Sequence, residues 1–333
     1  MIWLQFFACL VVILFAGTRL AKYADVIAEK SKLGRIWIGL ALVAMITAMP
    51  EMATGISSAT LVDSPDLAVG TLIGSCCFNL ALLAVLDIAN RKRPVLAQTS
   101  KRHLPGVRWG FLLLCIAGAG LFLAPRVSLP MLGWLSLSGL VLMVAYVFAI
   151  RRILMSERRD SAPDTSGVSR YGALNLRGAL VRFFGAAALV VVAGIWLSFV
   201  GDQIATITGW GSSFVGNLLL AAATSAPELV VCVSAVRMGF RDIAIADILG
   251  ANMLDTGMLG LVDAVYLRGS LFAGASQVNL AVMICAALMV GIMGIAIWRG
   301  TGRYLFWRVS WYGPLLVGLY VIAAYILFAF GAG

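Results

Sequence analysis

The pentapeptide TAMPE at residues 47–51 recurs as TSAPE at residues 224–228, and each copy lies inside a long apolar segment. Both copies place a glutamate directly after a proline, at Glu51 and Glu228. A charged side chain at the centre of a membrane helix costs roughly 2.5–3.5 kcal/mol, so such a residue is by default functional. The repeated motif therefore indicates a functional site inside a membrane that uses two carboxylates.

The two halves of the chain resemble each other well beyond this motif. Residues 74–79, GSCCFN, correspond to residues 250–255, GANMLD, after a loop that is one residue shorter in the second half. Further matching pairs are Gly34 and Gly211, Gly39 and Gly216, Ala44 and Ala221, and Gly139 and Gly318. Self-similarity of this kind marks an internal repeat. We therefore predict a chain made of two copies of one ancestral unit.

The composition is that of an integral membrane protein. Hydrophobic residues make up 62% of the chain and charged residues only 12%, with a mean hydropathy of +0.99. A helix needs about 20 apolar residues to cross a bilayer. Ten segments of about this length follow one another, at 2–18, 36–60, 67–89, 108–124, 131–150, 179–200, 212–236, 243–265, 276–298 and 309–330. We therefore predict an all-α integral membrane protein with ten transmembrane helices.

The basic residues predict how these segments are oriented. Of the 25 Lys and Arg residues, 23 lie in alternate loops, at 19–35, 90–108, 151–182, 237–242 and 299–308. Cytoplasmic loops carry such an excess of positive charge. Both termini are therefore expected on the extracytoplasmic side of the cell inner (plasma) membrane. The same asymmetry accounts for the net charge of +10 without nucleic acid as a partner, and a specific anionic-lipid site is the alternative explanation.

The number of segments in each half sets the relative orientation of the two copies. Residues 1–150 hold five segments, residues 151–178 form a polar cytoplasmic linker, and residues 179–333 hold five more. An odd number of spans per copy inverts the second copy relative to the first, as in transporters built from inverted repeats. Glu51 and Glu228 then enter the membrane from opposite sides and are expected to meet near its midplane.

Helical spacing shows which side chains share a face with the two glutamates, because residues three, four and seven apart lie on one face of a helix. In the second and seventh segments these are Ala44, Thr47, Ala48 and Glu51, and Ala221, Thr224, Ser225 and Glu228. In the third and eighth segments the matching pairs are Ser75 and Asn79, and Ala251 and Asp255. The four faces together present carboxylates, hydroxyls and an amide.

The two prolines add backbone oxygens to this set. Pro50 and Pro227 have no backbone N–H, so the carbonyl groups of Ile46 and Ala223 lose their usual helical partners. A freed carbonyl inside a membrane needs a neighbouring helix, water or a cation. Carboxylate, hydroxyl, amide and carbonyl oxygens suit calcium or sodium and do not suit zinc or copper. The sequence therefore predicts a site for a hard cation.

These motifs resemble those of the calcium/cation antiporter superfamily, and in particular those of the prokaryotic sodium/calcium exchangers. The resemblance lies in two alpha-repeats, at about 36–87 and 213–263, with the signature Thr-Ser-x-Pro-Glu followed by Gly-Asn-x-x-Gly-Ser-Asn. It implies that two glutamates bind Ca2+ and, in exchange, Na+ or protons. By position, the implied metal ligands are Glu51, Glu228, Thr47, Thr224, Ser225, Ser75, Asn79 and Asp255, with carbonyl oxygens of Ala44 and Ala221.

Three departures from the signature bear on the counter-ion. The signature serine is replaced by Ala48 in the first copy, and the serine after the glycine is replaced by Ala251 in the second. Asp247 stands where the family usually has an amide. Divalent binding is expected to be intact because both glutamates remain, whereas coupling to three sodium ions is in doubt. Asp247 is a candidate additional ligand or proton carrier.

The charge of the site predicts exchange. Two carboxylates in a medium of low dielectric repel each other, so a proton or a cation must neutralise them. Ca2+, Na+ and protons are then mutually exclusive occupants, which with alternating access gives antiport. We expect Ca2+ export in exchange for Na+, with an H+/Ca2+ or other divalent cation antiporter as the alternative. An intramembrane acid–base enzyme and a passive channel are the competing classes; we favour a transporter that is no enzyme and has no cofactor.

The remaining reactive residues predict no further chemistry, and the oligomeric state is left open. The six cysteines lie in apolar segments without metal-ligand spacing and are expected to be packing residues. His103, the single histidine, is expected in a cytoplasmic loop. Asp87 and Asp263 are expected to be helix-end residues. The chemistry of this chain is therefore concentrated in the two repeated motifs.

Overall fold

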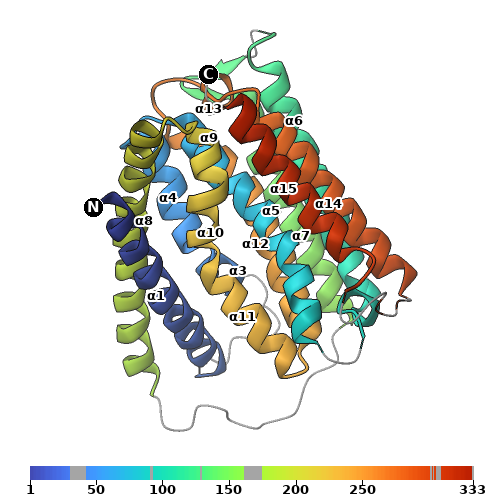
Figure 1. Ribbon diagram of the computed structural model, residues 1–333. Coiled ribbons are helices and arrows are strands. Elements are labelled where there is room, and N and C mark those ends of the chain that lie inside the picture. The colour runs from blue at the N-terminus through green and yellow to red at the C-terminus, as the bar shows by residue number, and fades with distance from the viewer. Residues whose placement is uncertain are drawn as a thin grey trace.

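Helices account for nearly all of the regular structure in the computed structural model, which describes residues 1–30, 43–90, 93–127, 130–160, 175–300, 302, 304 and 309–331 (Figure 1). The first half holds α1 (Ile2–Lys30), α3 (Val43–Thr47), α4 (Met49–Thr60), α5 (Pro65–Ala89), α6 (Leu104–Leu123) and α7 (Leu137–Asp160). The second half holds α8 (Leu176–Thr208), α9 (Ser212–Val215), η4 (Gly216–Leu220), α10 (Ala221–Thr224), α11 (Ala226–Arg237), α12 (Arg241–Val265), α14 (Asn279–Arg299) and α15 (Gly313–Phe330). Short helices η2 (Leu96–Gln98), η3 (Lys101–His103) and α13 (Leu271–Gly274) lie in the loops.

The described residues contain eight helices that are long and apolar enough to cross a membrane, namely α1, α5, α6, α7, α8, α12, α14 and α15. The segment from α9 to α11 forms a ninth if its two parts, which are bent by 47° relative to each other, count as one span. The predicted span at 36–60 is described from Val43 onward, as α3 and α4, and its first residues lie outside the described part. The predicted all-α membrane fold is confirmed.

Two predicted boundaries differ from the structure. The predicted span at 131–150 begins with a short antiparallel hairpin of β1 (Met131–Leu132) and β2 (Leu135–Ser136), so α7 starts only after it. Gly133 in the hairpin turn has a φ of 66°, a conformation that glycine adopts without a steric penalty. The predicted linker at 151–178 is also helical at both ends, because α7 continues to Asp160 and α8 begins at Leu176. Residues 161–174 lie outside the described part.

Local sequence signals fix several helix ends. The side chains of Ser64 and Asn175 each accept a hydrogen bond from the third backbone N–H of α5 and α8, at 3.3 Å and 2.7 Å. Such capping satisfies a backbone donor that has no partner within the helix. Pro65 occupies the first position of α5, where its missing N–H costs nothing. Gly209 ends α8 in the left-handed conformation, with a φ of 71°.

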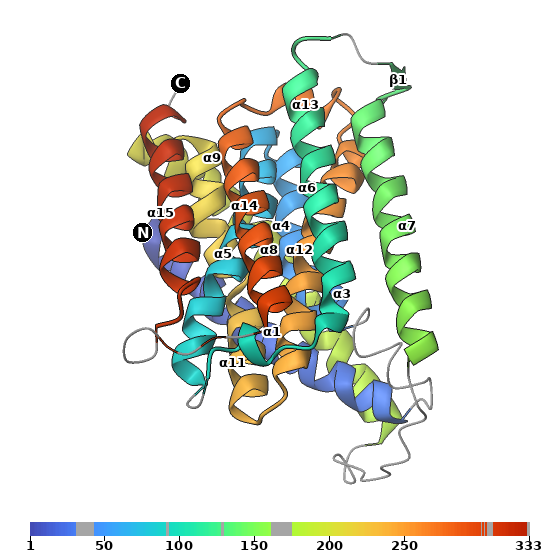
Figure 2. The same ribbon diagram turned by 90° about the vertical axis from the view of Figure 1, so that its right-hand side faces the viewer.

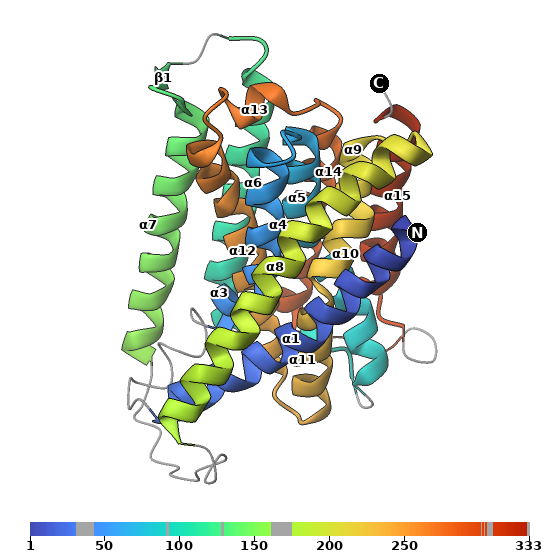
Figure 3. The same cartoon turned by 90° about the vertical axis from the view of Figure 1, so that its left-hand side faces the viewer.

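The helices α5 and α12 form the centre of the bundle (Figure 1). In their most apolar stretches 78% and 83% of the residues are buried, compared with 17–50% in the other long helices. The long helices α1 and α8 pack against each other along one side of the bundle, as Figure 3 shows, and α7 stands at another edge in Figure 2. Polar side chains on α5 and α12 are therefore enclosed by protein rather than exposed to lipid.

Two buried aspartates tie each repeat to the other. Asp87 and Asp263 are 1% and 0% exposed, and each accepts a hydrogen bond at 2.7 Å from the backbone N–H eight residues further along. Asp87 also accepts from the Tyr312 hydroxyl at 2.8 Å, and Asp263 accepts from the Ser136 hydroxyl at 2.7 Å. Each aspartate thus reaches from the end of its own helix to the segment that precedes the last span of the other repeat. The expectation that both are helix-end residues agrees with this arrangement.

The last span of each repeat begins with the same local motif. The Ser136 hydroxyl accepts a hydrogen bond from the Gly139 N–H at 3.0 Å, and the Ser310 hydroxyl accepts from the Gly313 N–H at 3.1 Å. The structure therefore pairs Gly139 with Gly313 rather than with the predicted Gly318. Sequence matching failed here because apolar residues around both glycines align equally well in several registers.

Candidate cation-binding site

Both repeated motifs break a helix. α3 ends at Thr47 and α4 begins two residues later, with Ala48 between them at φ −80° and ψ 9°. α10 and α11 are separated in the same way by Ser225, at φ −84° and ψ 7°. A proline in the first turn of each following helix supplies no N–H to the preceding turn, which is why the chain leaves the helical path at the same place in both copies.

Glu51 and Glu228 lie in the first turn of the two helices that follow the breaks. The N-terminal end of a helix carries a partial positive charge and unpaired N–H groups, so it stabilises a negative side chain there. In Figure 1, α4 leads to one end of the bundle and α11 to the other. The two glutamates are therefore held at the starts of half-helices of opposite direction, an arrangement that is found in inverted-repeat transporters.

The two glutamates are equally buried but have different partners. Each is 1% exposed. Glu51 Oε1 accepts a hydrogen bond from the Ser225 hydroxyl at 2.7 Å, across the two repeats. Neither carboxylate oxygen of Glu228 has a hydrogen-bond partner among the described residues. Ala48, which is the repeat equivalent of Ser225, has no hydroxyl to offer, so one motif substitution explains this difference.

The polar face of α5 continues the site. Ser75 and Asn79 are 0% and 1% exposed, and the Ser75 hydroxyl and the Asn79 carboxamide oxygen have no hydrogen-bond partner among the described residues. The equivalent face of α12 carries Asp255, which is 0% exposed and has two unpartnered oxygens within the same part of the chain. Since a buried polar atom without a partner is costly, each of these oxygens is a candidate ligand for a cation.

Charge also accumulates at this position. Glu228 interacts electrostatically with the carboxylates of Glu51, Asp247 and Asp255. Acidic residues are almost never fully buried unless something compensates their charge. Within the described residues, no three Asp, Glu, His or Cys side chains lie close enough to hold a metal ion alone. Hydroxyl, amide and carbonyl oxygens would therefore complete the coordination, as is usual for calcium.

The remaining expected ligands differ in their surroundings. Thr47 and Thr224 are 1% and 0% exposed, next to the two breaks. The Ala221 carbonyl accepts a hydrogen bond from the Thr224 hydroxyl at 3.2 Å and another from the Ser225 N–H at 2.9 Å, so it already has two donors. Ala44 lies in α3, and its side chain falls outside what the structure describes.

Asp247 lies two turns before Asp255 on α12 and is 5% exposed. Its Oδ2 accepts a hydrogen bond from the Cys232 thiol, with sulfur and oxygen 3.4 Å apart. The structure thus gives this candidate ligand a sulfur neighbour on α11. From the sequence we expect the cysteines to be packing residues, and this contact between a thiol and a carboxylate was not predicted.

Asn217 is a buried polar residue of this region that the sequence reading missed. It is 1% exposed, and both polar atoms of its side chain are unpartnered among the described residues. It lies in η4, a π-helical turn, and such turns are frequent at functional sites. Asn217 also continues the stripe of Ala221, Thr224 and Glu228 by one more turn, a spacing that could have revealed it.

Close backbone packing positions these elements. A Cβ atom on Gly74 would lie 2.5 Å from the Asn217 Cα and 2.9 Å from the Ala221 Cβ, so only glycine lets α5 approach so closely. Gly70 and Gly216 are equally restricted at the same crossing. The contact holds the Ser75 face of α5 against the broken helix.

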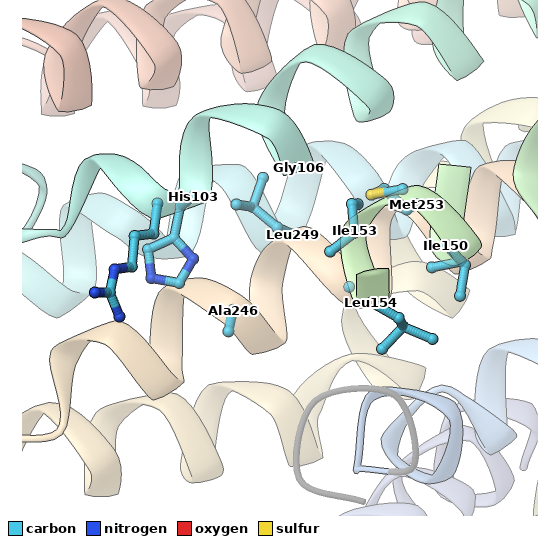
Figure 4. A pocket seen from close by; sticks show the side chains of 10 residues that line it. His103, Gly106, Ile150, Ile153, Leu154, Ala246, Leu249 and Met253 are labelled. Atoms are coloured by element: carbon cyan, nitrogen blue, oxygen red, sulfur yellow. The ribbon is translucent and has the colours of Figure 1, made fainter. Parts of the chain in front are cut away.

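The cleft in Figure 4 is separate from this site. It has a volume of about 70 Å³ and lies between α6, α7 and α12, with His103 at the end of η3, Gly106 on α6, and Leu249 and Met253 on α12. Its lining is mostly apolar. It takes a different face of α12 from Asp255, so it contributes no ligand to the candidate cation site.

Comparisons with known proteins identify the family. A sequence model of the family described as "Sodium/calcium exchanger protein" matches residues 1–154 and 178–331. Inner membrane protein YrbG of Escherichia coli (strain K12) is 25% identical over 329 residues, which cover 92% of this chain and 96% of YrbG. Sodium/calcium exchanger MaX1 of Methanosarcina acetivorans is 32% identical over 135 residues, or 39% of this chain and 35% of MaX1.

A solved structure has the same fold. The sodium-calcium exchanger NCX_Mj, in crystals soaked with Na+ and Sr2+, matches with a TM-score of 0.62 over 97% of this chain and 98% of NCX_Mj, at 21% sequence identity. The expected resemblance is therefore confirmed over nearly the whole length. Since the family match includes both motifs and all the helices described above, this chain belongs to the sodium/calcium exchanger protein family.

Proposed function

We propose that this protein is a secondary active antiporter that exports Ca2+ in exchange for Na+ through a site formed by Glu51 and Glu228 near the membrane midplane. Membership of the sodium/calcium exchanger family and the fold shared with NCX_Mj support cation antiport rather than enzymatic chemistry. The observation that carries the proposal is the hydrogen bond from Ser225 to Glu51, which joins the two broken motifs at one buried point.

The unpartnered oxygens are the ligands that we propose for the transported ion. Glu51 Oε2 and both oxygens of Glu228 would bind Ca2+ directly, because they are buried and without hydrogen-bond donors among the described residues. Ser75, Asn79 and Asp255 would supply oxygens from α5 and α12. Two glutamates balance the charge of one Ca2+, and without it they need Na+ or protons. This mutual exclusion couples the two fluxes.

Protons are the second candidate counter-ion. Ala48 and Ala251 each remove a hydroxyl that would otherwise coordinate a monovalent cation, and both are 1% exposed, so their Cβ atoms face protein rather than water. Asp247 adds a carboxylate to the same region. Fewer neutral oxygens and more acids favour neutralisation by protons, while both glutamates keep the affinity for a divalent cation.

The counter-ion is identified by Ca2+ uptake into proteoliposomes that contain the purified protein. An outward Na+ gradient at equal pH should drive uptake, and an outward proton gradient without Na+ should not. Uptake driven only by protons would replace Na+ by H+ in the proposal. Uptake that persists without any counter-ion gradient, with an accompanying current, would indicate a channel and contradict antiport.

We further propose that the protein lies in the inner (plasma) membrane with both termini on the extracytoplasmic side. The excess of Lys and Arg in alternate loops supports this orientation. A protease-cleavable tag at each terminus, probed in intact spheroplasts, should be removed from outside. Protection of both tags would show that the protein has the opposite orientation, and the direction assigned to each half-helix would then be reversed.

A further inference from the structure

A thiol and a carboxylate meet beside the glutamates in a way that the proposed calcium site does not use. Cys232 follows Glu228 by one helical turn on α11 and is 0% exposed. Its sulfur lies 3.4 Å from Asp247 Oδ2 and 3.6 Å from the carbonyl oxygen of Ala244, both on α12. The pair therefore joins the helix that carries Glu228 to the helix that carries Asp255.

These separations match the ligand spacing of a thiophilic metal ion. In a tetrahedral zinc site with a metal–sulfur bond of about 2.3 Å and a metal–oxygen bond of about 2.0–2.2 Å, the two ligand atoms stand about 3.5 Å apart. The two sulfur–oxygen distances at Cys232 lie on either side of this value. Loss of the thiol proton would free the sulfur to share an ion with these two oxygens.

The third side chain beside this pair is Glu228, one helical turn before Cys232 on α11. It is 1% exposed, both of its oxygens are unpartnered among the described residues, and it interacts electrostatically with Cys232 and Asp247. The three side chains do not yet surround a single point. The first ligands of an ion here would therefore be Cys232, Asp247 and the Ala244 carbonyl, and its charge would attract Glu228.

We propose that Cys232 and Asp247 form a second cation site that binds thiophilic divalent cations, such as Cd2+ and Zn2+, in preference to Ca2+. Thiolate ligands select such metals, whereas calcium prefers oxygen. On binding, the Cys232 S–H bond breaks, its proton passes to water, and a sulfur–metal bond forms. The bound ion attracts the Glu228 carboxylate away from the calcium site, so it competes with Ca2+. The competition with Ca2+ rests on the proposed function, whereas the binding of a thiophilic ion does not.

Binding is tested on the purified, full-length protein in detergent without Ca2+. Titration with Cd2+ should produce the near-ultraviolet absorption of a thiolate–cadmium bond with one equivalent per chain. The variant Cys232→Ser should lose this band and at least tenfold in Cd2+ affinity, and Asp247→Asn should weaken binding while keeping a thiol. Cys285→Ser, which removes a buried cysteine on α14, should bind like the wild type.

A wild-type band that survives in Cys232→Ser, or equal Cd2+ affinity in both proteins, would overturn the assignment. Unfolding midpoints without metal show whether each variant is folded, and Cys232→Ala serves as a second variant if the serine is not tolerated. In proteoliposomes, the Cd2+ concentration that halves Ca2+ uptake should rise at least tenfold in Cys232→Ser. If no Ca2+ exchange occurs at all, the proposed function fails, but the absorption titration still decides the metal site.

Discussion

Removing the Ser225 hydroxyl should weaken Ca2+ binding by about one to two orders of magnitude. The hydroxyl donates to Glu51 at 2.7 Å, and both residues are fully buried. A hydrogen bond to a charged group contributes roughly 1.5–3 kcal/mol. Ser225→Ala imposes this loss on the charged form of Glu51, which is the form that would bind Ca2+ in the proposed site.

A change of about 1.4 kcal/mol is a factor of ten in affinity, so the expected range for Ser225→Ala is roughly 10- to 100-fold. The measurement is the rise of the unfolding temperature of the purified protein as Ca2+ is titrated. Ser198→Ala is the matched control, because Ser198 is 0% exposed and its hydroxyl donates only within α8, to the Ile195 carbonyl at 2.7 Å.

The reciprocal variant tests the same reasoning in the opposite direction. Ala48 occupies the equivalent position in the first repeat, and Glu228 has no hydroxyl partner there. Ala48→Ser should therefore place a donor beside Glu228 and tighten cation binding. The reasoning is refuted if Ser225→Ala and Ser198→Ala bind Ca2+ with the same affinity while both remain folded.

Other consequences can be measured separately. Gly74→Ala should destabilise the protein by about 1–3 kcal/mol, because its Cβ must gain about 1 Å of clearance from η4. Gly291→Ala is the control and should not destabilise the protein, because no atom lies within 4 Å of its added Cβ. Equal denaturant midpoints for the two variants would contradict the close contact at Gly74. Asn217→Leu should weaken Ca2+ affinity, because it removes two buried polar atoms that have no partner among the described residues, and unchanged affinity would exclude Asn217 from the site. Asp263→Asn should lower the unfolding free energy by about 1–3 kcal/mol through lost charge-assisted hydrogen bonds, as judged by denaturation.

The helix breaks and the polar faces followed from short-range chemistry that a sequence displays directly. Pro50 and Pro227 offer no N–H to the turn that precedes them, and helical spacing alone places Thr224 and Glu228 on one face. The repeat then related the two motifs, although it could not fix the register of the last span. There the pairing of Gly139 with Gly313 depends on hydroxyl contacts rather than on apolar pattern.

Individual hydrogen bonds between helices could not be predicted, because they depend on how the faces dock. Cys232 and Asp247 lie on different helices and meet only when α11 crosses α12. The π-helical turn around Asn217 has no composition signature, and it exists beside a glycine crossing that brings two backbones together. Likewise, the difference between Glu51 and Glu228 became visible only when Ser225 was seen to reach across the repeats.

Calcium–calcium exchange tests the central claim most directly, because it needs both glutamates and no particular counter-ion. Proteoliposomes loaded with unlabelled Ca2+ are placed in tracer Ca2+ without Na+ and at equal pH on both sides. Wild-type protein should accumulate the tracer, whereas Glu51→Gln and Glu228→Gln should each reduce accumulation to that of protein-free vesicles. Near-normal tracer exchange in either variant would contradict a single calcium site formed by both carboxylates.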